Sequence, residues 1–218
     1  ANPAFTLTPM LSVGAGHLVE TFGTEELKQT YVEKMYSGIW GGTMALTEPD
    51  AGSDLANVQT RAKGDGFAAT EDPDTGMWIL NGTKVFITNG GIADVTVVVA
   101  TVDKDLGHRG QASFVVPKRT PGLSMGKKES KLGIRASQTS EVILEDCFVP
   151  DEHLLGLPGE GFKQALAILD GGRISIAALG VGIAQGAFDA AVAYAKQRRQ
   201  FGRPIGDFQG IRFKLADM

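Results

Sequence analysis

One short segment holds the densest set of polar groups that could bind a ligand. Met44-Ala-Leu-Thr-Glu-Pro-Asp-Ala-Gly-Ser53-Asp54 has the pattern of a strand that ends in a tight turn. Such a turn exposes several backbone N–H groups beside a hydroxyl and a carboxylate, and this set suits the carbonyl oxygens of a flavin pyrimidine ring or a phosphate. From spacing alone, an ordinary polar turn after an edge strand is the simpler interpretation.

A glycine-rich run offers a second chemistry. The segment from Ile174 to Gly186 resembles a strand that leads into the dinucleotide turn of a nicotinamide dehydrogenase. However, the downstream Arg198–Pro204 segment is not the apolar second strand, ending in an acidic residue, that this fingerprint requires. A helical seam also runs through the glycines at spacings of four and three, formed by Ile174, Ala178, Val181, Gln185, Phe188 and Val192. We therefore interpret Gly180, Gly182 and Gly186 as positions where helices pack closely.

Composition excludes several classes of protein. The 218 residues carry a formal net charge of −4 and 43% hydrophobic side chains, so the chain can bury a core but lacks the basic surface of a general nucleic-acid binder. The single Cys147 excludes an intrachain disulfide and is typical of a reducing compartment. His17, His108 and His153 lie far apart, so no metal site is expected. No run of 18 or more apolar residues exists, and hence no membrane span is expected.

The elements that position these residues fall into three zones. Residues 1–37 are predicted to be helical, with Thr24 as an N-cap, one apolar face at Leu27, Tyr31 and Met35, and Gly38 as the stop. Residues 161–199 return to helix along the seam, and a further helix is expected to start near Asp207. The chain stops within a helical pattern that lacks a stop signal, and we expect it to be a piece of a longer protein.

Residues 38–150 have the pattern of a β domain. Asn81-Gly82 is a strong hairpin signal, and no helical period interrupts the apolar runs, so a mostly antiparallel barrel or sandwich is expected, within an α+β chain. The predicted strands are Trp40–Thr47, Asn57–Lys63, Phe67–Thr70, Met77–Leu80, Lys84–Thr88, Val95–Val102, Ala112–Pro117 and Glu141–Phe148.

Five motifs in order resemble the acyl-CoA dehydrogenase family and together cover essentially the whole chain. They are Leu46-Thr-Glu-Pro-Asp-Ala-Gly-Ser53; Asn81-Gly-Thr-Lys-Val-Phe-Ile-Thr88-Asn-Gly90; Lys131-Leu-Gly-Ile-Arg135-Ala-Ser137 with Leu144-Glu-Asp-Cys-Phe-Val-Pro150; Gly159-Glu-Gly-Phe162 with Leu169-Asp-Gly-Gly-Arg173; and Arg198-Arg-Gln-Phe-Gly202 with Gln209. The resemblance implies that residues 1–37 end an N-terminal helical domain. Residues 38–150 would form the middle β domain, and residues 151–218 would begin a C-terminal helical bundle.

The resemblance also implies roles for individual residues. Thr88 would lie near flavin N5, and Thr47 would bind the pyrimidine edge. Arg198 and Gln209 would bind FAD across a subunit interface, Arg because its charged fork matches pyrophosphate oxygens. The cofactor set is Met44, Ala45, Leu46, Thr47, Gly52, Ser53, Phe86, Ile87, Thr88, Arg198, Gln200, Phe201 and Gln209, and the substrate set is Ser53, Leu169, Asp170 and Arg173.

Plainer interpretations stay open for several of these residues. Thr88 could be an ordinary strand threonine, Arg173 a structural ion-pair partner, and Arg198 part of a solvated helix end. The sequence also departs from the family pattern. Phe86 stands where many members have Trp, and Arg199-Gln200 stands where a Lys-Thr pair is common.

The implied reaction is FAD-dependent oxidation of an acyl-CoA to a trans-2-enoyl-CoA. Electrons would pass to an electron-transfer flavoprotein, and the enzyme would be a homotetramer or dimer in the bacterial cytoplasm or the mitochondrial matrix. A desolvated glutamate base is required. A minority of the family carries it where this chain has Gly172, so the base is expected beyond Met218, with Asp170 and Glu48 not replacing it, and the chain alone is expected to be inactive. The alternatives are an acyl-CoA oxidase or another relative that binds FAD and a CoA thioester, and a non-catalytic binding module.

Overall fold

The computed structural model describes residues 3–64 and 76–218, which form two compact units. One unit comprises Ala4–Gly172, and the other is built on Arg173–Met218. The predicted strand Phe67–Thr70 lies outside the described residues.

Helices open the larger unit. They are α1 (Pro3–Phe22), α2 (Glu25–Leu27), a π-helical turn (Lys28–Val32) and α3 (Glu33–Tyr36). The Thr24 hydroxyl accepts a hydrogen bond from Leu27 N at 3.3 Å, as expected of an N-cap. Leu27, Tyr31 and Met35 recur every four residues and are all buried, which confirms the predicted apolar face.

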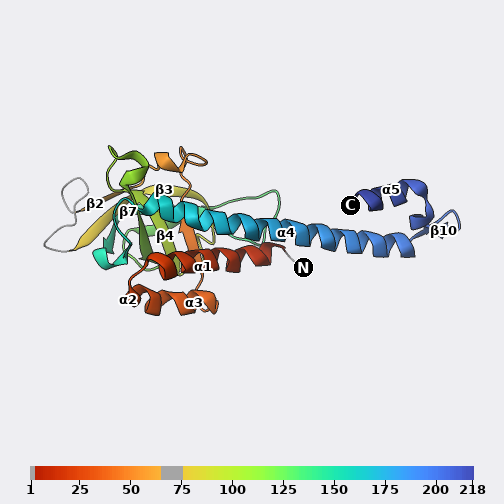
Figure 1. Cartoon of the computed structure of the whole chain (residues 1–218), viewed down its shortest axis with the longest axis horizontal. Coiled ribbons are helices and arrows are strands. Elements are labelled where there is room, and N and C mark those ends of the chain that lie inside the picture. Colours follow the sequence, from red (N-terminus) through yellow and green to blue (C-terminus); the bar gives the residue numbers. More distant parts are fainter. Residues whose placement is uncertain (1–2, 65–75) are drawn as a thin grey trace. The chain divides into compact units, whose positions relative to one another are not determined.

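One eight-stranded sheet forms the centre of this unit (Figure 1). Its strand order is β6-β7-β3-β2-β4-β5-β8, and β1 pairs with β4. The β1–β4 and β2–β4 pairs are parallel and all the others are antiparallel, so the expected antiparallel-rich β domain is confirmed. The strands are β1 (Gly42–Ala45), β2 (Arg61–Gly64), β3 (Met77–Thr88), β4 (Val95–Thr101), β5 (Gln111–Pro117), β6 (Leu123–Lys128), β7 (Thr139–Pro150) and β8 (Leu154–Leu155).

The hairpin predicted at Asn81-Gly82 is wrong, because β3 runs through both residues without turning. Gly82 has φ +155°, and a Cβ there would lie 2.5 Å from the Thr60 hydroxyl, so glycine is needed for the close approach of the segment before β2. On the neighbouring strand, β7 has one residue more than β3 near Asp146, which makes a β-bulge. The backbone N–H of Asp146 donates to the side-chain oxygen Oδ1 of Asn81 at 2.8 Å. Asn81 and Gly82 therefore stabilise the bulged pairing of β3 with β7 and do not form a turn.

Other boundaries also differ from the prediction. The β6 and β8 strands were not predicted, and part of the Asn57–Lys63 run is replaced by a 3₁₀ turn, Leu55–Asn57. β8 has only two residues, and β6 is a partly exposed strand with a weak apolar pattern. Sequence patterns mark buried strands best, because alternation is clearest where one face is covered. Further 3₁₀ turns lie at Gly107–Gly110, Asp151–His153 and Ile205–Asp207.

Two apolar clusters share the central strands. In β4, Val98 and Ala100 face a cluster that includes Trp78 and Phe114, whose ring centroids are 5.3 Å apart. Val95 and Val97 on the same strand face a second cluster with Leu18 and other helix side chains. The sheet is thus covered on both faces here, which explains the unbroken apolar run of β4.

The helix α4 (Gly161–Gln197) begins in the larger unit and ends in the smaller one. Gly180, Gly182 and Gly186 lie within it, which confirms that they are no dinucleotide turn. In the smaller unit a two-stranded hairpin, β9 (Arg199–Gln200) and β10 (Arg203–Pro204), precedes α5 (Gln209–Asp217).

The surface of α4 is unusually apolar. Ile174 is 75% exposed and Val181 is 71% exposed. By length and composition alone α4 could cross a membrane, because its most apolar stretch of 18 residues has a mean hydropathy of 1.6. Only 6% of that stretch is buried within the described structure. One helix of this kind is weak evidence for a membrane span, since the core helix of a soluble protein passes the same test.

Candidate functional site

The chain that follows β1 runs beside the end of β3. Thr43 Oγ1 donates to the Thr88 carbonyl at 2.5 Å, and Val85 N donates to the Thr47 carbonyl at 2.8 Å. These two links hold Thr47 and Thr88, both half-buried, against one stretch of the sheet although they lie on separate segments. The two threonines predicted to bind the flavin therefore lie on adjacent segments of the structure.

A bulge in β3 changes which side chains face outward. Between Lys84 and Ile87 the strand holds one residue more than β7 opposite, and Phe86 has φ +59°. In a regular strand Lys84 and Phe86 would share a face. Here Lys84 is fully buried and the Phe86 ring is 65% exposed. The bulge therefore presents an aromatic ring at the surface beside Thr88.

The turn after Thr47 is closed by its own backbone. Glu48 N donates to the Ala51 carbonyl at 2.9 Å, and Ala51 N donates back to the Glu48 carbonyl at 3.2 Å. Gly52 and Ser53 follow at the surface. The polar turn read from the sequence is thus a compact, hydrogen-bonded loop that leaves these two residues accessible.

Behind this loop lies a buried ion pair that the sequence analysis did not identify. Lys84 Nζ lies 2.8 Å from Glu48 Oε1 and also donates to the carbonyls of Leu46 and Val99, at 3.1 and 2.6 Å. The Glu48 carboxylate accepts the backbone N–H of Gln59 and Thr60 at 2.6 and 2.9 Å. No sequence signal marked the pair, because alternation in the predicted strand places Lys84 on the face opposite Val85 and Ile87.

Burial and pairing act in opposite directions on these charges. Burial lowers the pKa of the Lys84 ammonium and the nearby Glu48 carboxylate raises it. Burial has the larger effect, so the pKa falls to about 8. Burial alone would raise the pKa of Glu48, but the ammonium and the hydrogen bonds from Lys84, Thr60 and Gln59 outweigh it, so the pKa lies below its ordinary value. Glu48 is therefore an ionised structural acceptor, unsuited to act as a proton-abstracting base.

The remaining predicted cofactor residues of the larger unit differ in exposure. Met44 and Leu46 are half-buried, whereas the side chains of Ala45 and Ile87 are fully buried, so only their backbone could reach a ligand. Within the described residues, no hydrogen bond engages the hydroxyl or the backbone N–H of Thr47. A half-buried polar group without a protein partner calls for a ligand or water. These donors fit the carbonyl-bearing edge of a flavin.

In the smaller unit, the predicted dinucleotide residues lie on and beside the β9–β10 hairpin. Phe201 and Gly202 form its turn with φ of +52° and +79°, and Phe201 is 92% exposed. Arg198 precedes β9, and its carbonyl accepts Ile205 N at 2.8 Å. Gln200 lies in β9, and Gln209 begins α5 with its side chain exposed.

The predicted substrate residues beyond the loop are helical. Leu169 is half-buried, and Asp170 and Arg173 are exposed. The structure places Asp170–Arg173 within α4, in the stretch that was predicted to be helical. Gly172 is also within α4, and a Cβ there would meet nothing within 4 Å.

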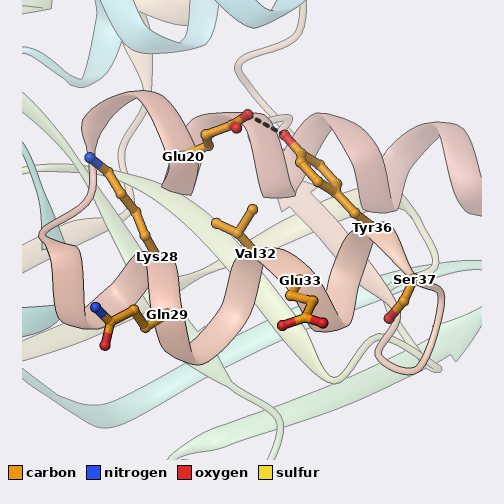
Figure 2. Close-up of a pocket in the computed structure, with 7 residues that line it drawn as sticks. All are labelled: Glu20, Lys28, Gln29, Val32, Glu33, Tyr36 and Ser37. Atoms are coloured by element: carbon orange, nitrogen blue, oxygen red, sulfur yellow. Dashed lines mark hydrogen bonds between the residues drawn. The ribbon is translucent and has the colours of Figure 1, made fainter.

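An open groove of about 540 Å³ lies elsewhere, between α1 and the π-helical turn with α3 (Figure 2). The Tyr36 hydroxyl donates to Glu20 Oε2 at 2.6 Å across it. Burial, and then this hydrogen bond, raise the pKa of the Tyr36 phenol. The groove contains none of the predicted site residues; its lining is Glu20, Lys28, Gln29, Val32, Glu33, Tyr36 and Ser37.

Metal and thiol chemistry find little support in the described part of the chain. No group of three or more His, Cys, Asp or Glu residues there is placed to hold a metal ion. Cys147 is fully buried, and burial raises the pKa of its thiol to about 11. The thiol is therefore protonated and unreactive at neutral pH.

Comparison with known proteins finds one family. The model of the acyl-CoA dehydrogenase middle domain matches residues 43–147, and that of the acyl-CoA dehydrogenase C-terminal domain matches residues 159–218. The short-chain-specific acyl-CoA dehydrogenase of Megasphaera elsdenii is 46% identical over 218 residues, which are 100% of this chain and 55% of that protein.

Solved structures give the same result. The butyryl-CoA dehydrogenase of Megasphaera elsdenii has a TM-score of 0.93 at 44% identity, over 99% of this chain and 55% of its own. A structure of the electron transferring flavoprotein of Acidaminococcus fermentans has a TM-score of 0.93 at 45% identity, over 100% of this chain and 55% of its own. The chain thus spans about half the length of the relatives that it matches.

Proposed function

The chain belongs to the acyl-CoA dehydrogenase family, and we propose that it supplies the FAD- and thioester-binding part of an enzyme that oxidises an acyl-CoA to a trans-2-enoyl-CoA. One observation carries the proposal. Hydrogen bonds from Thr43 and Val85 hold the segments of Thr88 and Thr47 side by side, and the Thr47 donors have no partner among the described residues.

Each group on these two segments has a proposed task. The loop from Met44 to Ser53 holds the flavin pyrimidine edge through Thr47, and the exposed Phe86 ring covers part of the flavin. FAD, when bound, accepts the hydride that leaves the β-carbon of the thioester. The Thr88 hydroxyl stands ready to donate a hydrogen bond where charge develops. Ser53, Leu169, Asp170 and Arg173 line the acyl-CoA path.

The base that removes the α-proton is proposed to be a glutamate outside these 218 residues. Two observations support this. Glu48 is buried and holds Lys84 together with two backbone N–H groups, so its oxygens are already occupied. Gly172 occupies the position on α4 where a minority of the family carries the base, and glycine offers no proton acceptor. The chain by itself is therefore expected not to oxidise an acyl-CoA.

The partners of the whole protein follow from the same resemblance. Electrons are proposed to pass to an electron-transfer flavoprotein, and the likeness to the Acidaminococcus fermentans structure supports this. Arg198, Gln200, Phe201 and Gln209 are proposed to bind the FAD of a neighbouring subunit in a homotetramer or dimer, because they are exposed on one small unit. The compartment is proposed to be the bacterial cytoplasm or the mitochondrial matrix.

The role of Thr88 can be tested by the Thr88→Val variant of the full-length protein. The variant is expected to reduce its flavin more slowly with butyryl-CoA, measured as the loss of visible flavin absorbance. The decrease in rate should be smaller than the roughly 10²-fold that follows the loss of one oxyanion-hole donor. FAD affinity should change less, because the hydrogen bond strengthens only as hydride arrives. Stopped-flow absorbance measures the rate, and flavin fluorescence quenching measures the affinity.

Thr83→Val is the matched control, because Thr83 is a half-exposed threonine on the same strand, β3, outside the predicted site. Equal rates in the two variants would remove Thr88 from the site. The alternative is an acyl-CoA oxidase. It would be indicated if the flavin of the wild-type protein is reduced by butyryl-CoA and is then rapidly reoxidised by O₂.

A further inference from the structure

The buried pair of Lys84 and Glu48 has no task in the proposed chemistry. Lys84 is 0% exposed and Glu48 is 5% exposed, so both ions have left water at considerable cost. A buried ion pair is weak evidence for stability, since well-packed apolar side chains often replace one without loss. Its presence directly behind the predicted flavin loop therefore calls for a reason other than stability.

The contacts of Lys84 use every donor that an ammonium has. A lysine ammonium has three N–H donors, and here they reach Leu46 O, Glu48 Oε1 and Val99 O, at 3.1, 2.8 and 2.6 Å. Two of these acceptors belong to the loop and the third to β4. The Lys84 side chain therefore links the loop to β4 in the sheet through hydrogen bonds.

This tie determines the orientation of one peptide group. The Leu46–Thr47 peptide bond is trans, as is every peptide bond within the described residues, and a trans peptide directs its C=O and its N–H to opposite sides. Because Lys84 holds the Leu46 carbonyl inward, the N–H of Thr47 is directed away from Lys84. The next carbonyl, that of Thr47, is held by Val85 N. Both peptide groups of Thr47 are thereby fixed while its two donors stay available.

We propose that Lys84 and Glu48 are positioning residues for the flavin: Lys84 orients the Leu46–Thr47 peptide so that the Thr47 N–H and hydroxyl meet the pyrimidine edge. Glu48 holds the ammonium in place and anchors it through Gln59 N and Thr60 N. This inference rests on the proposed function, because it assumes that the loop binds FAD.

The test compares Lys84→Met with Glu48→Gln in the full-length protein, depleted of flavin and reconstituted. Lys84→Met removes the contact with Leu46 and is expected to weaken FAD binding about tenfold, the effect of one misdirected hydrogen bond. Glu48→Gln removes the negative charge but keeps an amide oxygen that can accept from Lys84 Nζ, so the contact with Leu46 is weakened less and a smaller loss is expected. Fluorescence quenching gives the affinities. Amide hydrogen exchange without FAD should speed up at residues 46–51 in Lys84→Met and stay unchanged in β7.

Two further variants keep the outcome interpretable. Val149→Ala removes a fully buried side chain on β7 opposite Trp78, far along β3 from Lys84, and controls for general destabilisation. The double variant Lys84→Met/Glu48→Gln leaves no unpaired buried charge, so it can be measured even if Lys84→Met alone fails to fold. It is expected to lose as much FAD affinity as Lys84→Met.

The possible results separate the inference from the proposed function. If Lys84→Met and the double variant bind FAD no more weakly than Val149→Ala, or if Lys84→Met and Glu48→Gln lose equal affinity, the pair is merely structural and the inference is wrong. If the wild-type protein binds no FAD, the proposed function is wrong and the inference is overturned with it.

Discussion

The two compact units differ in how far they bury their apolar side chains. In Ala4–Gly172 large side chains such as Phe114 are fully buried, whereas in Arg173–Met218 Phe213 is 60% exposed and Ala195 is the one buried residue. Both units contain regular helix or strand with clear apolar periodicity. Periodicity therefore specifies which face of an element is apolar, and only the presence of a covering layer decides whether that face is buried.

The difference has a physical basis in the elements themselves. A sheet with helices on one face can close a core within a single segment of chain. A long helix has no second layer of its own, so the seam from Ile174 to Val192 needs other helices, in the same subunit or in another. Most of the folding free energy of this chain is thus expected to come from the larger unit.

The sharpest test of this contrast substitutes one phenylalanine in each unit. Phe114→Ala is expected to lower the free energy of unfolding by about 3–5 kcal/mol, because it opens a cavity in a closed core. Phe213→Ala should stay within about 0.5 kcal/mol, since the ring is already largely in water. Urea unfolding followed by circular dichroism measures both. Similar losses would contradict the contrast between the units.

Charged pairs give a second contrast. Glu48→Gln leaves the buried Lys84 without its counter-charge and should cost about 3 kcal/mol near pH 7. The Arg212–Asp207 pair of the smaller unit is 4.0 Å long and exposed, so Asp207→Asn should cost less than about 1 kcal/mol. The two unfolding free energies at one pH decide between the expectations.

The pH dependence of the same variant has a definite sign. The pKa of Glu48 is lowered in the folded protein from an ordinary 4.5. Its contribution to stability is therefore complete above about pH 4.5 and is lost as the pH falls through the folded-state pKa. The stability difference between wild type and Glu48→Gln should shrink between pH 6 and pH 3. A constant difference would show that Glu48 is not an ionised partner.

Glycine substitutions give the smallest and most local contrast. Gly82→Ala should destabilise the protein by about 1–3 kcal/mol, because the new Cβ would meet Thr60 at 2.5 Å. Gly180→Ala places a Cβ with nothing within 4 Å and should stabilise α4 by up to about 1 kcal/mol in this chain. In the assembled protein the same change should become unfavourable if helices pack closely there. Thermal unfolding of this chain and of the full-length protein makes the comparison.

Local chemistry determined much of this protein from its sequence. The Thr24 cap, the Leu27–Tyr31–Met35 face and the passage of α4 through its glycines depend on neighbours three or four residues away, and so could be predicted. The antiparallel-rich character of the β domain followed from the absence of helical periods between its apolar runs, although the Asn81-Gly82 hairpin was wrong. The residues of the candidate site were found through a resemblance, because a polar turn alone does not specify a ligand.

Long-range contacts decided the rest. Asn81-Gly82 has the local preference of a hairpin, but Thr60 and a bulge in β7 require the strand to continue. Lys84 reads as a surface residue, yet acceptors on the loop after β1 and on β4 surround it. Whether a polar group is buried depends on partners distant in sequence. Only the tertiary structure brings these partners together.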